Sequence, residues 1–159
     1  MTALGGPPAL RHVLHLDVEV GAPIEVGRTS AGLRRVIPIG GGTVSGLFAG
    51  RVLPGGADFQ VIRADPGDEV TTELEARYVL ESDAGELVYV DNRGLRVASA
   101  ADIERLRRDE PVDPARVYFR TVARFETAAD RLSELTRRIH LGVAARHPRA
   151  VVLDVFCVE

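Results

Sequence analysis

The sequence predicts an all-β, mainly antiparallel protein, and three observations support this fold class. Short runs rich in Val, Ile, Leu, Phe and Tyr alternate apolar and polar residues at period two, as half-buried strands do. Turn sequences such as L-P-G-G-A-D, D-P-G-D, S-D-A-G-E and D-N-R-G separate these runs. Segments with helical spacing are few and short. Many strands at this spacing favour a closed barrel or a sandwich over βαβ units.

A Gly/Pro-rich stretch over residues 1–10 is expected to be a flexible leader, followed by a single domain over 11–159. The expected strands, in chain order, cover 12–20, 32–39, 43–53, 58–63, 69–81, 86–92, 116–123, 137–146 and 150–158.

Two segments are expected to be short helices. Residues 99–109 place Ile103 and Leu106 on one side, and residues 127–135 place Leu132 and Leu135 three apart. Neither helix could hold a core alone, so each is expected to plug or flank one end of the barrel. Their apolar faces indicate packing rather than a partner surface.

Composition excludes several classes of function. The chain has 159 residues and a formal net charge of −3, so no general positive field favours nucleic acid. No apolar run approaches the ~20 residues that span a membrane, and the start lacks a secretory pattern, so a cytoplasmic location is expected. The chain has no lysine, which excludes lysine Schiff bases and P-loop phosphate binding. The single Cys157 is expected to be a buried, inert thiol.

The Gly-rich stretch I-P-I-G-G-G-T at 37–43 resembles a phosphate loop only superficially. A strand-like segment follows it, whereas phosphate loops lead into a helix N-terminus. The glycines are better explained by a bulge or a sharp bend at a barrel corner. No cofactor is expected, and no Cys/His grouping has the spacing of a metal site.

The segment V-Y-F-R-T-V-A-R-F-E-T over 117–127 is the strongest candidate for a site. Tyr118 and Arg120 share one row of a strand, and Glu126 follows soon after. If that row faces a barrel lumen, the Arg120 guanidinium must be paired, with Glu126 or Asp58 as its partner. Two interpretations stay open: a structural ion pair, or an anion clamp beside an acid/base group.

Two further segments supply candidate side chains. Asp58 and Gln60 share a row at a strand's start, where the carboxylate could satisfy turn N–H groups or face the lumen as a base. Tyr78 lies on an apolar strand face, either as a core residue or as a donor lining a pocket. The four histidines are scattered without a Ser–His–Asp arrangement.

Several blocks together resemble one family. R-V-I-P-I-G-G-G-T, V-L-P-G-G-A-D-F-Q, A-R-Y-V-L, D-N-R-G-L-R, V-D-P-A-R-V-Y-F-R-T and R-F-E-T occur in this order over 12–158. The sequence is similar to the Domain of Unknown Function 3237 family of small bacterial proteins. The resemblance implies a single closed, calycin-like β-barrel with a polar central pocket. It carries over the block residues Asp58, Arg77, Tyr78, Tyr118, Arg120, Phe125, Glu126 and Thr127.

Three functional hypotheses follow. The first is a cofactor-free isomerase, cyclase or lyase that moves protons on a small organic metabolite in the lumen. Its catalytic residues would be Asp58, Tyr78, Tyr118, Arg120 and Glu126, and its ligand-binding residues Arg35, Gln60, Arg77 and Phe125. The alternative is a non-catalytic small-molecule carrier, and the third is a structural module with a filled lumen. The expected partner is a small molecule, not nucleic acid or a membrane, with a homo-oligomer as a further option.

Overall fold

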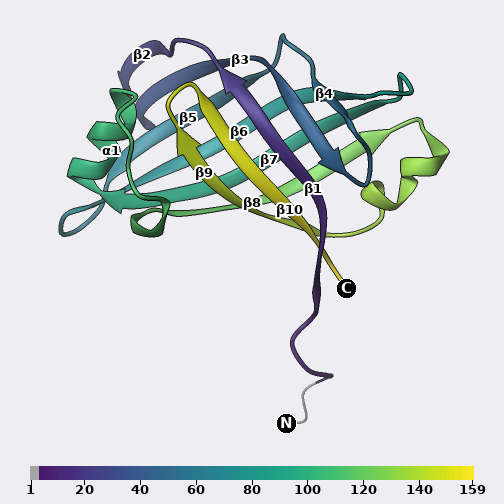
Figure 1. The fold of residues 1–159 in the computed structure, drawn as a ribbon. Coiled ribbons are helices and arrows are strands. Elements are labelled where there is room, and N and C mark those ends of the chain that lie inside the picture. Colours follow the sequence, from purple (N-terminus) through teal and green to yellow (C-terminus); the bar gives the residue numbers. More distant parts are fainter. Residues whose placement is uncertain (1–3) are drawn as a thin grey trace.

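Ten antiparallel strands form the body of the protein in the computed structural model, which describes residues 4–159 (Figure 1). The strands are β1 (Leu10–Val20), β2 (Ile24–Thr29), β3 (Gly32–Gly46), β4 (Gly50–Val52), β5 (Ala57–Ala64), β6 (Glu69–Ser82), β7 (Leu87–Ser99), β8 (Tyr118–Thr127), β9 (His140–His147) and β10 (Ala150–Val158). The expected leader over 1–10 is only partly covered, because residues 1–3 lie outside the described residues.

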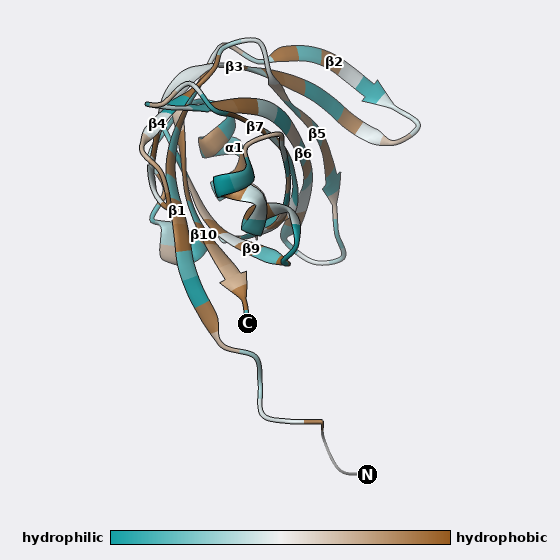
Figure 2. Ribbon diagram, turned by 90° about the vertical axis from the view of Figure 1, so that its right-hand side faces the viewer, coloured by the Kyte–Doolittle hydropathy of each residue, from teal (hydrophilic) through white to brown (hydrophobic). Residues whose placement is uncertain are grey.

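The strands close into a barrel, as the sequence predicts. Hydrogen-bonded pairs run from β1 through β10, β9, β8, β7 and β6, then through β5 and β4 to β3, which pairs again with β1. The view along the barrel shows the strands as a ring around a lumen (Figure 2). Closure leaves β2, which pairs only with β3 among the described strands, as an edge strand. None of the helices within residues 4–159 has the length and apolar character to cross a membrane.

The Gly-rich stretch forms a bend inside one long strand. Strand β3 runs through it without a break, and its pairing with β1 shifts by one residue between Gly41 and Ile39. This shift is the bulge expected from the glycines. Gly42 has φ of +135°, and a Cβ there would lie 2.0 Å from the carbonyl oxygen of Asp17. The two strands therefore approach too closely for any side chain at this position.

Helix α1 (Ala100–Arg107) covers one end of the barrel, directly after β7 (Figure 1). Ser99 caps it by accepting a hydrogen bond from the Asp102 backbone N–H at 3.1 Å. Ile103 and Leu106 pack with the buried residues Ile62, Ala98 and Val112 in a small second core. The short 3₁₀ helix η1 (Pro114–Arg116) follows and leads into β8. The expected helix over 99–109 is thus present, and it covers a barrel end.

The other end of the barrel is closed by the 3₁₀ helix η2 (Asp130–Thr136). Leu132 and Leu135 are fully buried there in the main core, whose other members come from the barrel strands. The expected helix over 127–135 therefore begins three residues later and is a 3₁₀ helix. Apolar side chains pack at this end beside the buried His140.

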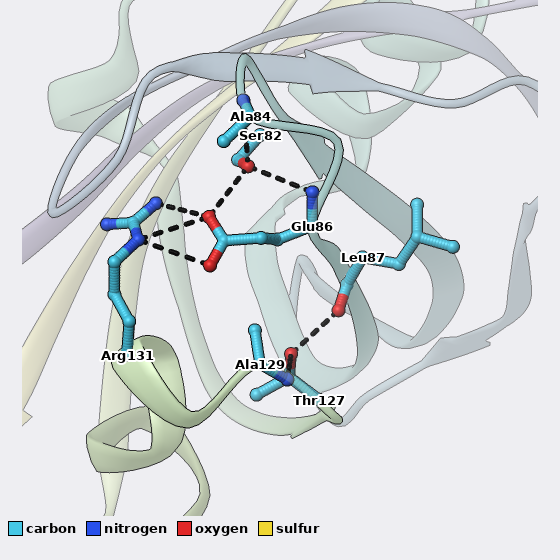
Figure 3. Close-up of polar contacts among 7 residues, drawn as sticks. All are labelled: Ser82, Ala84, Glu86, Leu87, Thr127, Ala129 and Arg131. Atoms are coloured by element: carbon cyan, nitrogen blue, oxygen red, sulfur yellow. Dashed lines mark hydrogen bonds and ion pairs between the residues drawn. The ribbon is translucent and has the colours of Figure 1, made fainter.

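A set of polar contacts holds η2 against the turn between β6 and β7 (Figure 3). Arg131 Nε lies 3.1 and 3.2 Å from the two carboxylate oxygens of Glu86. Ser82 Oγ donates to Glu86 Oε1 at 3.0 Å and accepts from the Glu86 backbone N–H at 3.1 Å. Thr127 Oγ1 donates to the Leu87 carbonyl at 2.7 Å. Thr127, a residue of the R-F-E-T block, therefore helps to fix this end of the barrel.

Candidate functional site

The inner wall of the barrel changes from polar to apolar along its length. Strand register places Gln60 opposite Leu74, Asp58 opposite Ala76, and Arg96 between Thr72 and Phe119. Buried polar residues gather at and near the end covered by α1: Arg35, Asp58, Gln60, Thr72, Asn92, Arg96 and Thr121. The half toward η2 carries residues such as Leu80, Val88 and Phe125. A lumen with one polar end is the arrangement that binds and orients a small molecule.

Among residues 4–159, two carboxylates are buried: Asp102 of α1, whose Oδ2 lies 2.9 Å from Arg116 Nη2, and Asp58 on this polar wall. Asp58 is 9% exposed. Its Oδ2 accepts a hydrogen bond from Gln60 Nε2 at 2.7 Å, and its Oδ1 accepts from the Glu75 backbone N–H at 3.2 Å. Burial raises the pKa of Asp58, and the hydrogen bond from Gln60 and the charge of Arg96 oppose that rise only in part. The carboxylate is therefore held in the lumen by neutral donors, and no cation within residues 4–159 contacts it.

A cavity of about 50 Å³ lies inside the barrel beside Asp58. Its polar lining residues are Asp58, Tyr78, Asn92 and Thr121, and the rest of its wall is apolar. Asn92 Oδ1 and Thr121 Oγ1 are buried without a hydrogen-bond partner among residues 4–159. Burial, and then the nearby negative charge of Asp58, raises the pKa of Tyr78, so its phenol stays protonated. The cavity thus brings one proton acceptor and one proton donor together with free polar atoms.

Three arginines lie at the polar end. Arg35 and Arg96 are 3% and 2% exposed, and the Arg146 side chain is 9% exposed. Arg35 Nε lies 2.9 Å from Glu25 Oε1, close enough for an ion pair but at an angle unsuited to a hydrogen bond. Arg146 Nη2 donates to Asp109 Oδ1 at 2.7 Å. Glu25 and Asp109 lie at the rim, so they neutralise these two guanidiniums from outside the lumen.

Arg96 differs from the other two arginines. Its guanidinium stacks over the Phe119 ring at 5.6 Å, and its Nε is buried without a hydrogen-bond partner among residues 4–159. Desolvation lowers the pKa of Arg96 to about 10, and the charge of Asp58 opposes that fall. The guanidinium therefore remains charged near neutral pH, although no carboxylate of the described residues contacts it.

The structure corrects the expected convergence on strand β8. Tyr118 is 53% exposed and Arg120 is exposed beside it, while Phe119 and Thr121 of the alternate row face the lumen. Arg120 Cζ lies 5.4 Å from the centre of the Tyr118 ring, and its Nη1 donates to the Phe119 carbonyl. Glu126 is on the same outer row. Tyr118, Arg120 and Glu126 therefore lie on the other side of the barrel wall from Asp58 and Tyr78.

The remaining predicted residues divide in the same way. Arg35 and Gln60 lie in the buried polar set, and Phe125 is buried with its ring 5.2 Å from the His140 ring. Arg77 points outward, where its Nη2 lies 3.2 Å from Glu75 Oε2. The structure thus brings together Arg35, Asp58, Gln60 and Tyr78 from the predicted set, with Phe125 deeper in the core.

Tyr118 and Arg120 line a different feature, an open hollow of about 970 Å³ on the outer wall. Exposed apolar side chains such as Leu95 and Val122 share this hollow. Two of its charged residues form an ion pair, with 3.0 Å between Arg93 Nη1 and Glu75 Oε1. Most of the residues that line this hollow are exposed, unlike those of the buried polar wall of the lumen.

Sequence reasoning missed Asn92, Arg96, Thr121 and Arg146. A signal for two of them exists, because Asn92 and Arg96 lie four residues apart and therefore on one face of a strand. Arg96 lies beyond the predicted strand end at residue 92, since β7 continues to Ser99. Residues 4–159 contain no group of three or more His, Cys, Asp or Glu side chains arranged to hold a metal ion.

Comparisons with known proteins agree on the family. The family model described as Protein of unknown function (DUF3237) matches residues 8–158. A UPF0311 protein of Bradyrhizobium diazoefficiens is 44% identical over 145 residues, covering 91% of this chain and 93% of that protein. A UPF0311 protein of Clostridium acetobutylicum is 38% identical over 149 residues, covering 92% of each.

Solved structures share the barrel. A conserved protein of unknown function from Rhodopseudomonas palustris superposes with a TM-score of 0.87 at 42% identity over 100% of both chains. A beta-barrel like protein from Acinetobacter baumannii has a TM-score of 0.83 at 35% identity, over 99% of this chain and 100% of that one. An enzyme from Penicillium herquei has a TM-score of 0.71 at 17% identity over 100% of both chains, which shows a common fold only. The chain belongs to the DUF3237 family of proteins of unknown function.

Proposed function

We propose that the protein is a cofactor-independent enzyme of the isomerase, cyclase or lyase type. It moves a proton from one atom to another of a small organic molecule bound in the lumen. Asp58 acts as the base, and Tyr78 donates a hydrogen bond. The observation that carries this proposal is the Asp58 carboxylate, which lines the cavity without a contacting cation. A carboxylate in such a place destabilises the fold, and proteins retain such groups where chemistry requires them.

The two groups suit opposite halves of a proton transfer. A raised pKa makes the Asp58 carboxylate a stronger base than an exposed one, closer to the optimum for general base catalysis near neutral pH. A raised pKa keeps the Tyr78 phenol protonated, so it can donate to an oxygen on which negative charge develops. In the reaction, Asp58 accepts a proton from a C–H or O–H group and returns it at a second atom, which restores the enzyme.

The other cavity residues support binding and orientation. Asn92 and Thr121 offer unpartnered side-chain oxygens, and Leu74, Ala76 and Leu153 provide apolar contact. A cavity of about 50 Å³ is well below the ~300 Å³ at which drug-sized sites begin, so it fits a compound of few atoms. The enzyme from Penicillium herquei supports the proposal only in that this fold can carry an enzyme.

The test compares the wild type with Asp58→Asn on fractionated bacterial metabolites in D₂O. The proposal expects at least one small compound to be isomerised, or to gain deuterium at carbon, with the wild type and not with the variant. Tyr78→Phe should slow the same conversion, whereas Tyr118→Phe on the outer wall should leave it unchanged. A compound that binds both proteins without any conversion would support the carrier alternative and contradict the enzyme.

A further inference from the structure

Three arginines are buried at the polar end of the lumen, and each has one carboxylate nearby. Arg35, Arg96 and Arg146 are all buried or nearly so, and Asp58 is the one carboxylate that faces them from the buried wall. Glu25 and Asp109 neutralise the two outer arginines from the rim. The charges left inside are Arg96 and Asp58, and they influence each other's pKa without touching.

No carboxylate among residues 4–159 contacts Arg96, and its Nε has no hydrogen-bond partner there. Burying a guanidinium without pairing it is costly, so such groups are normally paired or hydrogen-bonded. Here the Nε is enclosed with no hydrogen-bond partner among residues 4–159, and the Phe119 ring lies against the guanidinium. Thr72, its neighbour across the β6–β7 pair, also has a buried Oγ1 without a partner. Adjacent unpartnered donor groups of this kind are what a bound anion satisfies.

The surroundings favour an anion with an apolar body. Phe119 and Leu74 adjoin Arg96 and Thr72 in the strand register, and both line the cavity. A planar carboxylate matches the fork of a guanidinium, and one further hydroxyl can donate to it. A single unpaired arginine also matches one negative charge rather than the two of a phosphate monoester.

We propose that the ligand of the lumen is a small monocarboxylate whose carboxylate lies at Arg96 and Thr72 and whose apolar body lies in the cavity against Leu74 and Phe119. This inference rests on the proposed function, because it names the substrate class of the same site. In it Arg96 anchors the substrate, while Asp58 at the neighbouring part of the wall moves the proton.

The test measures binding without turnover, by titrating ¹⁵N-labelled protein and following the backbone amides of β6 and β7. The probes are acetate, propionate and benzoate, each paired with its neutral amide of the same shape. We expect saturable shifts with at least one carboxylate, and binding of its amide at least about tenfold weaker, as expected for a lost charge-assisted hydrogen bond.

Matched variants locate the site. Arg96→Gln should weaken carboxylate binding about tenfold or more, whereas Arg120→Gln on the outer wall should bind as the wild type does. Thr72→Val keeps the shape of the side chain and should weaken binding several-fold. If Arg96→Gln does not fold, this variant alone tests whether the carboxylate binds at this place. Asp58→Asn should bind carboxylates more tightly, because it removes a nearby negative charge.

The results separate this inference from the proposed function. Equal affinity for carboxylate and amide, no saturable shift with any carboxylate, or undiminished binding in the Arg96 and Thr72 variants would overturn the inference. Carboxylate binding that needs Arg96, without any conversion that needs Asp58, would support the inference and contradict the enzyme.

Discussion

Replacing Asp58 by asparagine should stabilise the protein at neutral pH, although it removes the proposed base. The wild-type carboxylate accepts from Gln60 Nε2 and the Glu75 backbone N–H, and Gln60 Oε1 is buried without a partner. In Asp58→Asn the new carbonyl oxygen keeps the bond from Glu75. The new amide donates to Gln60 Oε1 after the Gln60 side chain turns by half a rotation. Gln60 Oε1 gains a donor while Gln60 Nε2 loses its acceptor, so the number of hydrogen bonds is unchanged and the net change is the loss of the buried charge.

The size of the effect follows from the removed charge. Each unit by which burial raises the pKa of Asp58 in the wild type corresponds to about 1.4 kcal/mol of stability at neutral pH. For a chain of this size, 1 kcal/mol shifts Tm by about 2–4 °C. Asp58→Ala is the contrasting variant, because it leaves two buried donors without an acceptor and should be destabilised by about 1–3 kcal/mol per donor.

The pH dependence of unfolding determines whether Asp58→Asn is more or less stable than the wild type. The pKa of Asp58 is raised in the folded state above its unfolded value of about 3.9, so below that value the protonated carboxyl and the amide are nearly equivalent. As pH rises through the folded pKa, the wild type loses stability and the variant does not. Urea unfolding of both proteins, from acid to neutral pH, should show that the difference between their free energies of unfolding grows as pH rises. A variant less stable than the wild type at neutral pH, with the gap closing in acid, would refute the reasoning and indicate a structural ion pair with Arg96.

Three further predictions concern packing and access. Gly142→Ala should cost about 1–3 kcal/mol in urea unfolding, because its Cβ would lie 2.1 Å from Thr121 Oγ1 on the lumen wall; a neutral effect would contradict this wall geometry. Leu132→Ala should cost about 2–5 kcal/mol, since this fully buried side chain closes the η2 end, and a smaller loss would mean that the end is loosely packed. Asp109→Ala removes the ion pair to Arg146 and should speed hydrogen exchange in α1 relative to η2; equal rates in both proteins would show that this contact does not hold the cap.

The barrel could be predicted from local chemistry, because its signals are local. The turn sequences and the period-two alternation identify most strands, and the bulge in β3 follows from its glycines. Strand β2 (Ile24–Thr29) was missed, since its residues are largely exposed and show little alternation of burial. The predicted break between 39 and 43 was wrong, because glycines can bend a strand without ending it.

The site was harder to predict. The alternation of side chains along a strand defines two rows, but it does not say which row faces the lumen. On β8, Tyr118 and Arg120 were expected to converge with Asp58 and Tyr78, but the lumen takes Phe119 and Thr121. The inner row of β8 is the more apolar one, with Phe119, Ala123 and Phe125, which is the usual signal for burial. The polar side chains of the outer row gave the opposite expectation, because polar groups are also what a binding site requires. Arg96 and Arg146 become buried only through barrel closure, which brings together strands far apart in the sequence.

The most direct test of the account is the ionisation of the Asp58 carboxyl in the free protein. A ¹³C NMR titration of Asp side chains, with Asp58→Asn to assign the resonance, measures its pKa. The account predicts a midpoint above the ordinary value of about 3.9, as expected for a buried carboxylate without a contacting cation. A midpoint at or below that value would show that the carboxylate is stabilised as a structural ion pair, and would contradict its role as the base.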